Sequence, residues 1–103
     1  MTKYHAVPVI VDGVRFASKR EGARYGELSL MQAAGEIQDL VCHPSWPLMV
    51  NGHKVARYVA DFSYYDCKAD RPVVEDVKGY LTPVYKIKRN LMKAIYGIEI
   101  LET

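Results

Sequence analysis

The chain has 103 residues, of which 50% are hydrophobic and 25% charged, the ordinary balance of one soluble globular domain. No apolar run approaches the roughly 18 residues of a membrane span, and the N-terminus lacks the basic and cleavage regions of a signal peptide. A net charge of +2 gives no argument for a nucleic-acid partner, and two cysteines without CxxC spacing are expected to be reduced thiols of a cytosolic protein.

The N-terminal half of the sequence predicts a hairpin, a helix and a second hairpin. VPVIV-DG-VRF is typical of a hairpin, because Asp-Gly between apolar runs suits a type I′ turn. A helix is expected from Ser18 to about Ala34, since SKRE is a capping box with Glu21 as its acidic partner and a glycine follows the last turn. The longer second hairpin, SWPLMV-NG-HKVARYVADFSYY, should turn at its Asn-Gly.

The remainder predicts a strand in VVEDVKG (73–79), a second helix and a closing strand in IEIL. Thr82 should cap this helix, with Pro83 in the first turn and Gly97 after the end. The order after the leading hairpin is α-β-β-β-α-β. We therefore expect a single domain over residues 1–103 with an α/β (α+β) fold, in which two helices flank a central mixed sheet.

A small group of acids and one lysine are the candidates for chemistry. Side chains alternate along a strand, so Asp76 shares a face with Lys78, whereas Glu75 points to the other face. Asp61 is the lone acid of an apolar and aromatic stretch, where a charge is costly unless it is paired or binds a metal. If the two strands are neighbours, Asp61 and Asp76 converge at one end of the sheet beside Lys78.

Two carboxylates and a lysine on adjacent strands suit metal-assisted phosphodiester cleavage. Mg²⁺ takes hard oxygen ligands, lowers the pKa of a bound water and neutralises charge on phosphate. A nearby lysine can orient that water or stabilise the transition state. The alternative is a partly exposed ion pair between Asp76 and Lys78, since D-x-K alone is a weak signal. The role of Glu21 is also undecided: it is either a further acid of the site or only the acidic partner in the capping box.

The second helix is predicted to be amphipathic, with a basic face. At about 100° per residue, one apolar stripe comprises Val84, Ile87, Leu91, Ala94 and Ile95. The opposite face comprises Thr82, Lys86, Arg89, Asn90 and Lys93. Residues 79–98 contain four basic residues and no acid. A solvated face usually explains such a pattern, but this helix begins just after Lys78 and can lead a phosphate backbone towards the site.

Other reactive side chains do not form a recognisable centre. The cysteines and histidines lack the spacing of a zinc knuckle, so we expect no structural zinc on Cys42, His43, His53 and Cys67. No Ser/His/Asp or Cys/His arrangement has a supporting local motif.

Four segments in order resemble the PD-(D/E)XK nuclease superfamily, and more closely a small family of it from phages and prophages. They are FASKREGARYGEL, AAGEIQDL, YVADFSY and VVEDVKGYLTPVYKIK, which lie between residues 16 and 88. The superfamily has a restriction-endonuclease-like α-β-β-β-α-β core, which agrees with the predicted order. Ala60 stands where the motif has its proline, and Asp76 stands where it can have glutamate.

The resemblance implies a Mg²⁺- or Mn²⁺-dependent DNA endonuclease with the catalytic residues Glu21, Asp61, Asp76 and Lys78. The implied metal ligands are Asp61, Asp76, Glu21 and the backbone carbonyl of Val77, with Glu75 as the fallback acid. The expected DNA contacts are Lys86, Arg89, Lys93 and Thr82. Branched DNA is a candidate substrate, a homodimer a candidate assembly, and the cytoplasm of a bacterial host the expected location. The alternatives are a non-catalytic DNA-binding or assembly component of a phage replication or packaging system, and an RNA nuclease.

Overall fold

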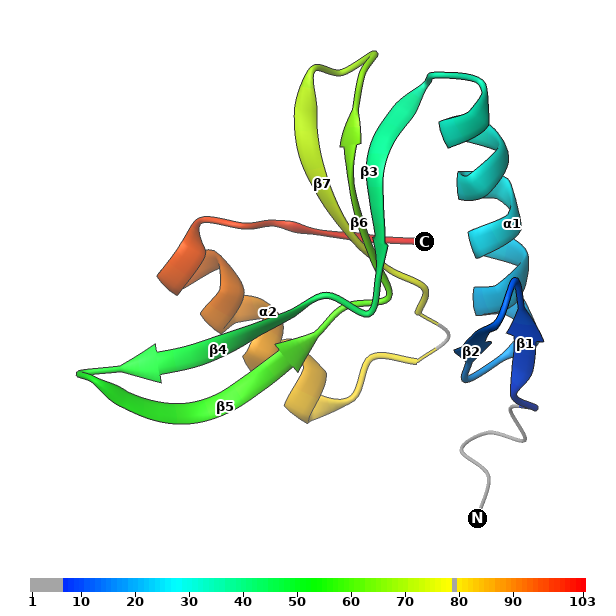
Figure 1. The fold of residues 1–103 in the computed structure, drawn as a ribbon. Helices are drawn as coiled ribbons and strands as arrows, with labels where there is room; N and C mark the ends of the chain where they lie inside the picture. The colour runs from blue at the N-terminus through cyan, green and yellow to red at the C-terminus, as the bar shows by residue number, and fades with distance from the viewer. Residues whose placement is uncertain (1–6, 79) are drawn as a thin grey trace.

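A computed structural model of the chain describes residues 7–78 and 80–103. The strands are β1 (Val9–Val11), β2 (Val14–Phe16), β3 (Ile37–Cys42), β4 (Ser45–Val50), β5 (His53–Val59), β6 (Phe62–Asp66), β7 (Arg71–Asp76) and β8 (Ile100–Glu102), and the helices are α1 (Lys19–Ala33) and α2 (Pro83–Tyr96). Four strands form a mixed sheet in the order β3-β6-β7-β8, in which only β7 and β8 run parallel. Helix α1 lies against one side of this sheet and α2 lies towards the other (Figure 1). The predicted α+β fold, with two helices flanking a mixed sheet, is confirmed for the described residues.

Short-range signals in the sequence set the turns and helix ends. Both hairpin turns place consecutive residues at positive φ, 51° and 78° at Asp12-Gly13 and 50° and 78° at Asn51-Gly52, as a type I′ turn requires. Ser18 and Thr82 cap the two helices through their side-chain oxygens. Gly97 ends α2 in the left-handed region, with φ of 69°. These elements form where the sequence predicts them.

The β1–β2 hairpin packs against the beginning of α1. Gly22 is buried there, and a Cβ built on it would lie 2.6 Å from Cγ2 of Val9, closer than carbon atoms approach. The absence of a side chain at Gly22 therefore lets the hairpin and helix meet closely. This contact fixes the first turns of α1, which carry Glu21.

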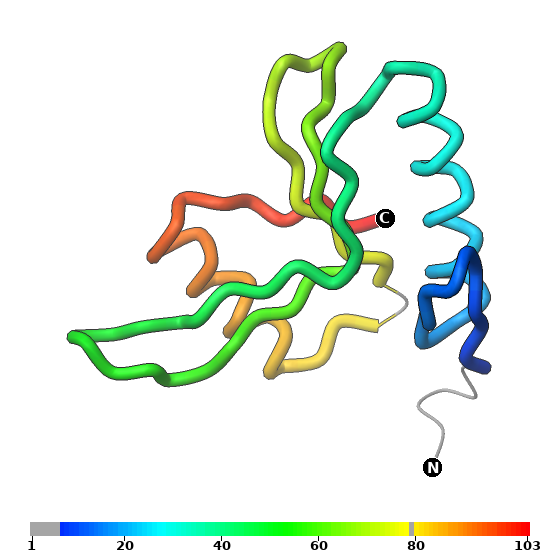
Figure 2. The backbone as a smooth tube through the Cα atoms, viewed as in Figure 1, coloured from blue at the N-terminus to red at the C-terminus, as the bar shows by residue number. Residues whose placement is uncertain are grey.

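The arrangement of the strands differs from the prediction in two places. Strand β3 was not predicted, because Asp39 at φ of 59° and a shift in register after Gln38 interrupt its alternation. The residues expected to form one long hairpin are also divided. β4 and β5 form a separate two-stranded arm that projects from the main sheet, while β6 belongs to the main sheet (Figures 1 and 2).

The division between β5 and β6 falls at Ala60 and Asp61. Here His43 N–H donates to the Asp61 carbonyl at 2.9 Å, and Ala60 N–H donates to the Pro44 carbonyl at 3.0 Å. These bonds form the root of the arm. Because the chain bends there, Tyr58 and Ala60 pack in the cluster beside α2, whereas residues further along β6 pack beside α1. A single alternating strand across this region was therefore a wrong prediction.

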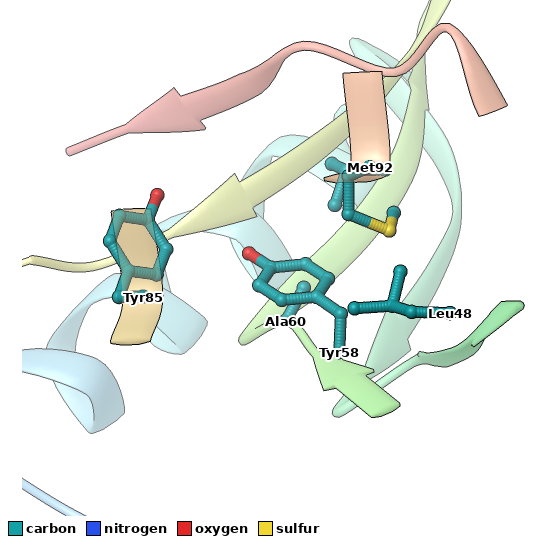
Figure 3. Packing of buried hydrophobic residues seen from close by; sticks show 6 residues of the cluster. Leu48, Tyr58, Ala60, Tyr85 and Met92 are labelled. Carbon is teal, nitrogen blue, oxygen red and sulfur yellow. The ribbon is translucent and has the colours of Figure 1, made fainter. Parts of the chain in front are cut away.

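Two buried clusters lie on the two sides of the sheet. The α1 cluster comprises Phe16, Leu28, Ile37, Phe62 and Tyr64. The α2 cluster comprises Leu48, Tyr58, Ala60, Val74, Tyr85 and Met92. Figure 3 shows the side chains of the α2 cluster gathered from the arm, the sheet and α2. The clusters therefore hold each helix to the sheet, and the second one also holds the arm.

The predicted apolar stripe of α2 is wrong in part. Val84 and Ile87 are 61% and 60% exposed, whereas Tyr85 and Met92 are buried. The Tyr85 ring fills the α2 cluster while its hydroxyl donates to Glu102 at 2.6 Å, a combination that a purely apolar pattern does not detect. Within the described residues, neither helix is long and apolar enough to cross a membrane.

Candidate functional site

Asp61 and Asp76 lie side by side where the β6–β7 pair ends. Phe62 is opposite Glu75 in the register, so the residues next to them, Asp61 and Asp76, come together beyond that pair. The Asp61 N–H donates to Oδ1 of Asp76 at 3.0 Å, and the Val77 N–H donates to Oδ2 of Asp61 at 2.7 Å. The structure thus brings together the two acids that the sequence predicted to converge.

Asp76 is a buried carboxylate, only 1% exposed. Its Oδ2 accepts a hydrogen bond from the Tyr58 hydroxyl and lies 3.6 Å from Nζ of Lys78. Burial raises the pKa of Asp76 to about 6, although the hydrogen bond from Tyr58 and the charge of Lys78 act in the opposite direction. Each oxygen of Asp76 is therefore oriented by a donor, and its negative charge is only partly compensated.

Lys78 lies beyond the strand on which it was predicted. β7 ends at Asp76, and the glycine expected to close the strand falls outside the described residues. Lys78 is held instead by its backbone N–H, which donates to the Thr103 carbonyl at 3.0 Å. Its Nζ lies 4.1 Å from the ring centroid of Tyr85, a cation–π distance. The ammonium group is thus placed between an aromatic face and the Asp76 carboxylate.

Glu21 has the capping role, which is one of the two roles that the sequence left open. Its backbone N–H donates to Oγ of Ser18 at 3.1 Å, and the Ser18 hydroxyl donates to Oε2 of Glu21 at 3.3 Å. Burial raises the pKa of Asp61, and the negative charge of Glu21 raises it further, against a lowering by the Val77 N–H. Glu21 therefore acts electrostatically on Asp61 while it caps α1.

Glu75, the fallback acid, belongs to a different cluster. It is fully buried and accepts two hydrogen bonds from Arg24, at 2.6 and 2.9 Å, and one from the Tyr64 hydroxyl at 2.7 Å. The Thr103 hydroxyl also donates to it, at 3.2 Å. The prediction that Glu75 points away from Asp76 is confirmed, since all these partners lie towards α1 and the C-terminal strand.

The basic face of α2 is partly neutralised by acids near the C-terminus. Arg89 forms an ion pair with Glu102 at 2.8 Å, and Lys93 forms one with Glu99 at 2.7 Å. Lys86 is exposed. The Thr82 hydroxyl accepts the Tyr85 N–H at 3.0 Å and so has a capping role. The helix pattern could not reveal these pairings, because both acids follow α2 in the sequence.

The side chains that orient the site were not predicted. The hydroxyl of Tyr58 reaches Asp76, the ring of Tyr85 supports Lys78, and the guanidinium of Arg24 binds Glu75. No pattern in one sequence distinguishes these residues from ordinary core and surface positions, because their roles depend on contacts across elements.

The donor set fits a divalent cation of the Mg²⁺ type. Mg²⁺ is commonly held by one or two carboxylates, with waters and substrate phosphate completing its coordination. Asp61 and Asp76 supply such a pair, and the raised pKa of both shows negative charge in a desolvated place. Over residues 7–78 and 80–103, no three His, Cys, Asp or Glu side chains are gathered closely enough to hold a metal. Glu21 therefore does not complete a three-residue cluster with the pair.

These features define an α+β protein whose mixed sheet ends in two adjacent carboxylates beside a lysine, with Asp76 buried and Asp61 half-buried. The class rests on Asp61 and Asp76 with Lys78 at the end of β7. The chain belongs to the family described as "Protein of unknown function (DUF1064)", which it matches over residues 1–100. No curated protein and no solved structure matches it.

Proposed function

We propose that the protein is a metal-dependent DNA endonuclease. The observation that carries this proposal is the joining of Asp61 and Asp76 through the 3.0 Å hydrogen bond, with Nζ of Lys78 at 3.6 Å from the same Asp76 carboxylate. Placing a half-buried carboxylate beside a buried one costs folding free energy, and acids with such raised pKa values are concentrated at functional sites. Phosphodiester cleavage uses this combination of hard oxygen donors and a fixed cation.

In this proposal Asp61 and Asp76 hold Mg²⁺ or Mn²⁺ with the Val77 carbonyl as a further donor, and Glu21 joins them by turning its carboxylate away from the Ser18 hydroxyl. When bound, the metal supplies a water of lowered pKa and offsets charge on the phosphate. Lys78 donates to that water or to a phosphate oxygen, because Tyr85 and Asp76 hold its ammonium group in place. Attack of water on phosphorus with departure of the 3′-oxygen leaves a 5′-phosphate and a 3′-hydroxyl.

The proposed path of the DNA follows α2. Lys86 is exposed near the start of this helix. Arg89 and Lys93 reach phosphates by exchanging their present partners, Glu102 and Glu99. A chain of 103 residues offers a short footprint, which a homodimer would extend. The proposed setting is phage DNA metabolism in the cytoplasm of a bacterial host, with branched or structured DNA as a candidate substrate.

The test is incubation of the folded protein with Mg²⁺ or Mn²⁺ and with branched, nicked, single-stranded and duplex DNA, beside an RNA of the same sequence. We expect DNA cleavage that EDTA abolishes and that falls by at least about 10²-fold in Asp76→Ala and Lys78→Ala. Lys68→Ala, at an exposed lysine in the turn after β6, is the matched control and should cut like the wild type.

Three results contradict the proposal in different ways. Intact DNA in every reaction, with a folded protein, excludes a DNA endonuclease. Full activity in both Asp76→Ala and Lys78→Ala places the reaction elsewhere. Binding that weakens with salt but needs no metal and never leads to cleavage supports the non-catalytic DNA-binding alternative.

A further inference from the structure

The most complete polar cluster outside the carboxylate pair is the one around Glu75. Four hydrogen bonds converge on this fully buried carboxylate, from the guanidinium of Arg24, the hydroxyl of Tyr64 and the hydroxyl of Thr103. Burial raises the pKa of Glu75, but the bonds from Arg24 and Tyr64 outweigh it, and the net pKa is lowered. Glu75 is therefore an ionised anchor inside the protein.

This anchor joins the two elements that carry the candidate site. Glu75 immediately precedes Asp76 on β7, and Arg24 follows Glu21 by one turn of α1. The Arg24 side chain is 23% exposed, and its Nε lies 2.6 Å from Oε2 of Glu75. A two-pronged guanidinium–carboxylate contact fixes orientation as well as distance, because both N–H bonds must align with both oxygens. The contact thus ties the first turns of α1 to the end of β7.

The fold has other means of holding α1. Leu28 is fully buried in the α1 cluster, and Gly22 meets the β1–β2 hairpin. Buried ion pairs are in general weak contributors to stability, since apolar pairs of similar volume often replace them without loss. The Arg24–Glu75 pair is accordingly not needed merely to keep the helix on the sheet. What it adds is a fixed position of α1 along and around its axis.

We infer that Arg24 and Glu75 are positioning residues that set where Glu21 lies relative to Asp61 and Asp76. This inference rests on the proposed function, because it assigns Glu21 to the same metal centre. Because Arg24 of α1 binds Glu75 of β7, the strand that carries Asp76 also determines where Glu21 lies. In the described part of the chain, neither side chain of the pair hydrogen-bonds to Asp61 or Asp76, so the pair acts through the position of α1.

The test is a double-mutant cycle read by Mn²⁺ binding, with calorimetry on proteins without DNA. In the wild-type background, Glu21→Gln should weaken Mn²⁺ binding by on the order of tenfold. The paired replacement Arg24→Met with Glu75→Leu should give a folded protein whose Mn²⁺ affinity is also lower by on the order of tenfold. Adding Glu21→Gln to that pair should then change Mn²⁺ affinity by less than about twofold, because Glu21 no longer reaches the ion in the protein that lacks the Arg24–Glu75 contact.

Two further variants separate positioning from charge and from packing. Arg24→Lys keeps the charge but offers one point of contact in place of the fork, so its Mn²⁺ affinity should fall between that of the wild type and that of the apolar pair. Glu27→Gln removes the other acid near Arg24, an exposed partner at 3.8 Å, and should bind Mn²⁺ like the wild type. Circular dichroism and thermal unfolding establish that each variant is folded.

The outcomes distinguish this inference from the proposal on which it depends. If wild-type protein binds Mn²⁺ and Glu21→Gln weakens binding equally in both backgrounds, Arg24 and Glu75 do not position Glu21 and the inference is wrong. If wild-type protein fails to bind Mn²⁺, or binds it unchanged after Asp76→Ala, the proposed metal centre fails first and the inference falls with it. A merely structural pair would lower the unfolding temperature without changing the effect of Glu21→Gln.

Discussion

The backbone N–H of Asp61 donates to the side chain of Asp76, so the two candidate ligands are joined through main chain on one side and side chain on the other. The Asp61 carboxylate is in turn held by the Val77 N–H, just beyond Asp76. Each acid is therefore oriented by the segment that carries the other. Because the donor is the Asp61 backbone, a substitution at Asp61 leaves this hydrogen bond possible, whereas removal of the Asp76 carboxylate abolishes it.

Asp76→Asn should make the protein more stable near neutral pH while removing the proposed metal ligand. The pKa of Asp76 is raised to about 6 in the folded protein, against about 3.9 when unfolded, so ionisation at neutral pH opposes folding. We expect a gain of roughly 1–3 kcal/mol above pH 6 that disappears below about pH 4, where the wild-type acid is protonated in both states. Denaturation at pH 7 and pH 4 measures it, with the exposed Glu27→Gln as control.

Glu75→Gln should have the opposite effect. The pKa of Glu75 is lowered in the folded protein, so its charge stabilises the fold above the unfolded pKa of about 4.3 and loses that effect as pH falls through the folded value. Removing the charge leaves Arg24 facing a neutral amide and should cost about 2–3 kcal/mol at pH 7. Urea denaturation at pH 7 and pH 3 should show the difference shrinking in acid, and a difference independent of pH would contradict the ion-pair explanation.

Gly22→Ala and Gly26→Ala should differ in sign although both lie in α1. Alanine favours a helix interior by about 0.8–1.0 kcal/mol over glycine. At Gly26 an added Cβ meets no atom within 4 Å, so that variant should be more stable. At Gly22 the Cβ would lie 2.6 Å from Cγ2 of Val9, and the hairpin must move away from the helix. Thermal unfolding of the two variants tests this, and equal gains would mean that the β1–β2 hairpin is not packed there.

Lys86 and Lys93 should contribute unequally to the proposed DNA binding because, of the two, only Lys93 has an acidic partner among the described residues, at 2.7 Å. Lys86→Ala should weaken binding for all sequences alike and lower the salt slope by about one unit. Glu99→Gln frees Lys93 for phosphate, so it should strengthen binding and steepen the slope. Fluorescence anisotropy at several salt concentrations measures both. Opposite changes, or none, would place the DNA away from α2.

The sequence was a good guide wherever structure depends on neighbouring residues. Helix caps, type I′ turns and the end of α2 follow from local chemistry, as at Ser18, Thr82 and Gly97. It was a poor guide where chain direction depends on distant partners. The bend at Asp61 and the irregular strand around Asp39 have no local signature, because the hydrogen bonds that define them come from residues distant in the sequence.

The candidate site was also predictable only where the arrangement depends on a single strand. Alternation along β7 separated Asp76 from Glu75, since it depends on one strand alone. The partners of these acids come from elements far away in sequence. Tyr58 precedes Asp76 by 18 residues, and Arg24 precedes Glu75 by 51. Such pairings arise only when the whole fold places those elements in contact.

These separations also imply an order of events during folding. Asp61 immediately precedes β6 and Asp76 ends β7, so these acids, 15 residues apart, flank a hairpin with a short turn, whereas Arg24 and Glu75 must close a loop of 51 residues. The entropy lost on closing a loop rises with its length, so the β6–β7 hairpin should form ahead of the docking of α1. The two carboxylates should then meet in a partly folded chain, before Arg24 brings α1 to Glu75.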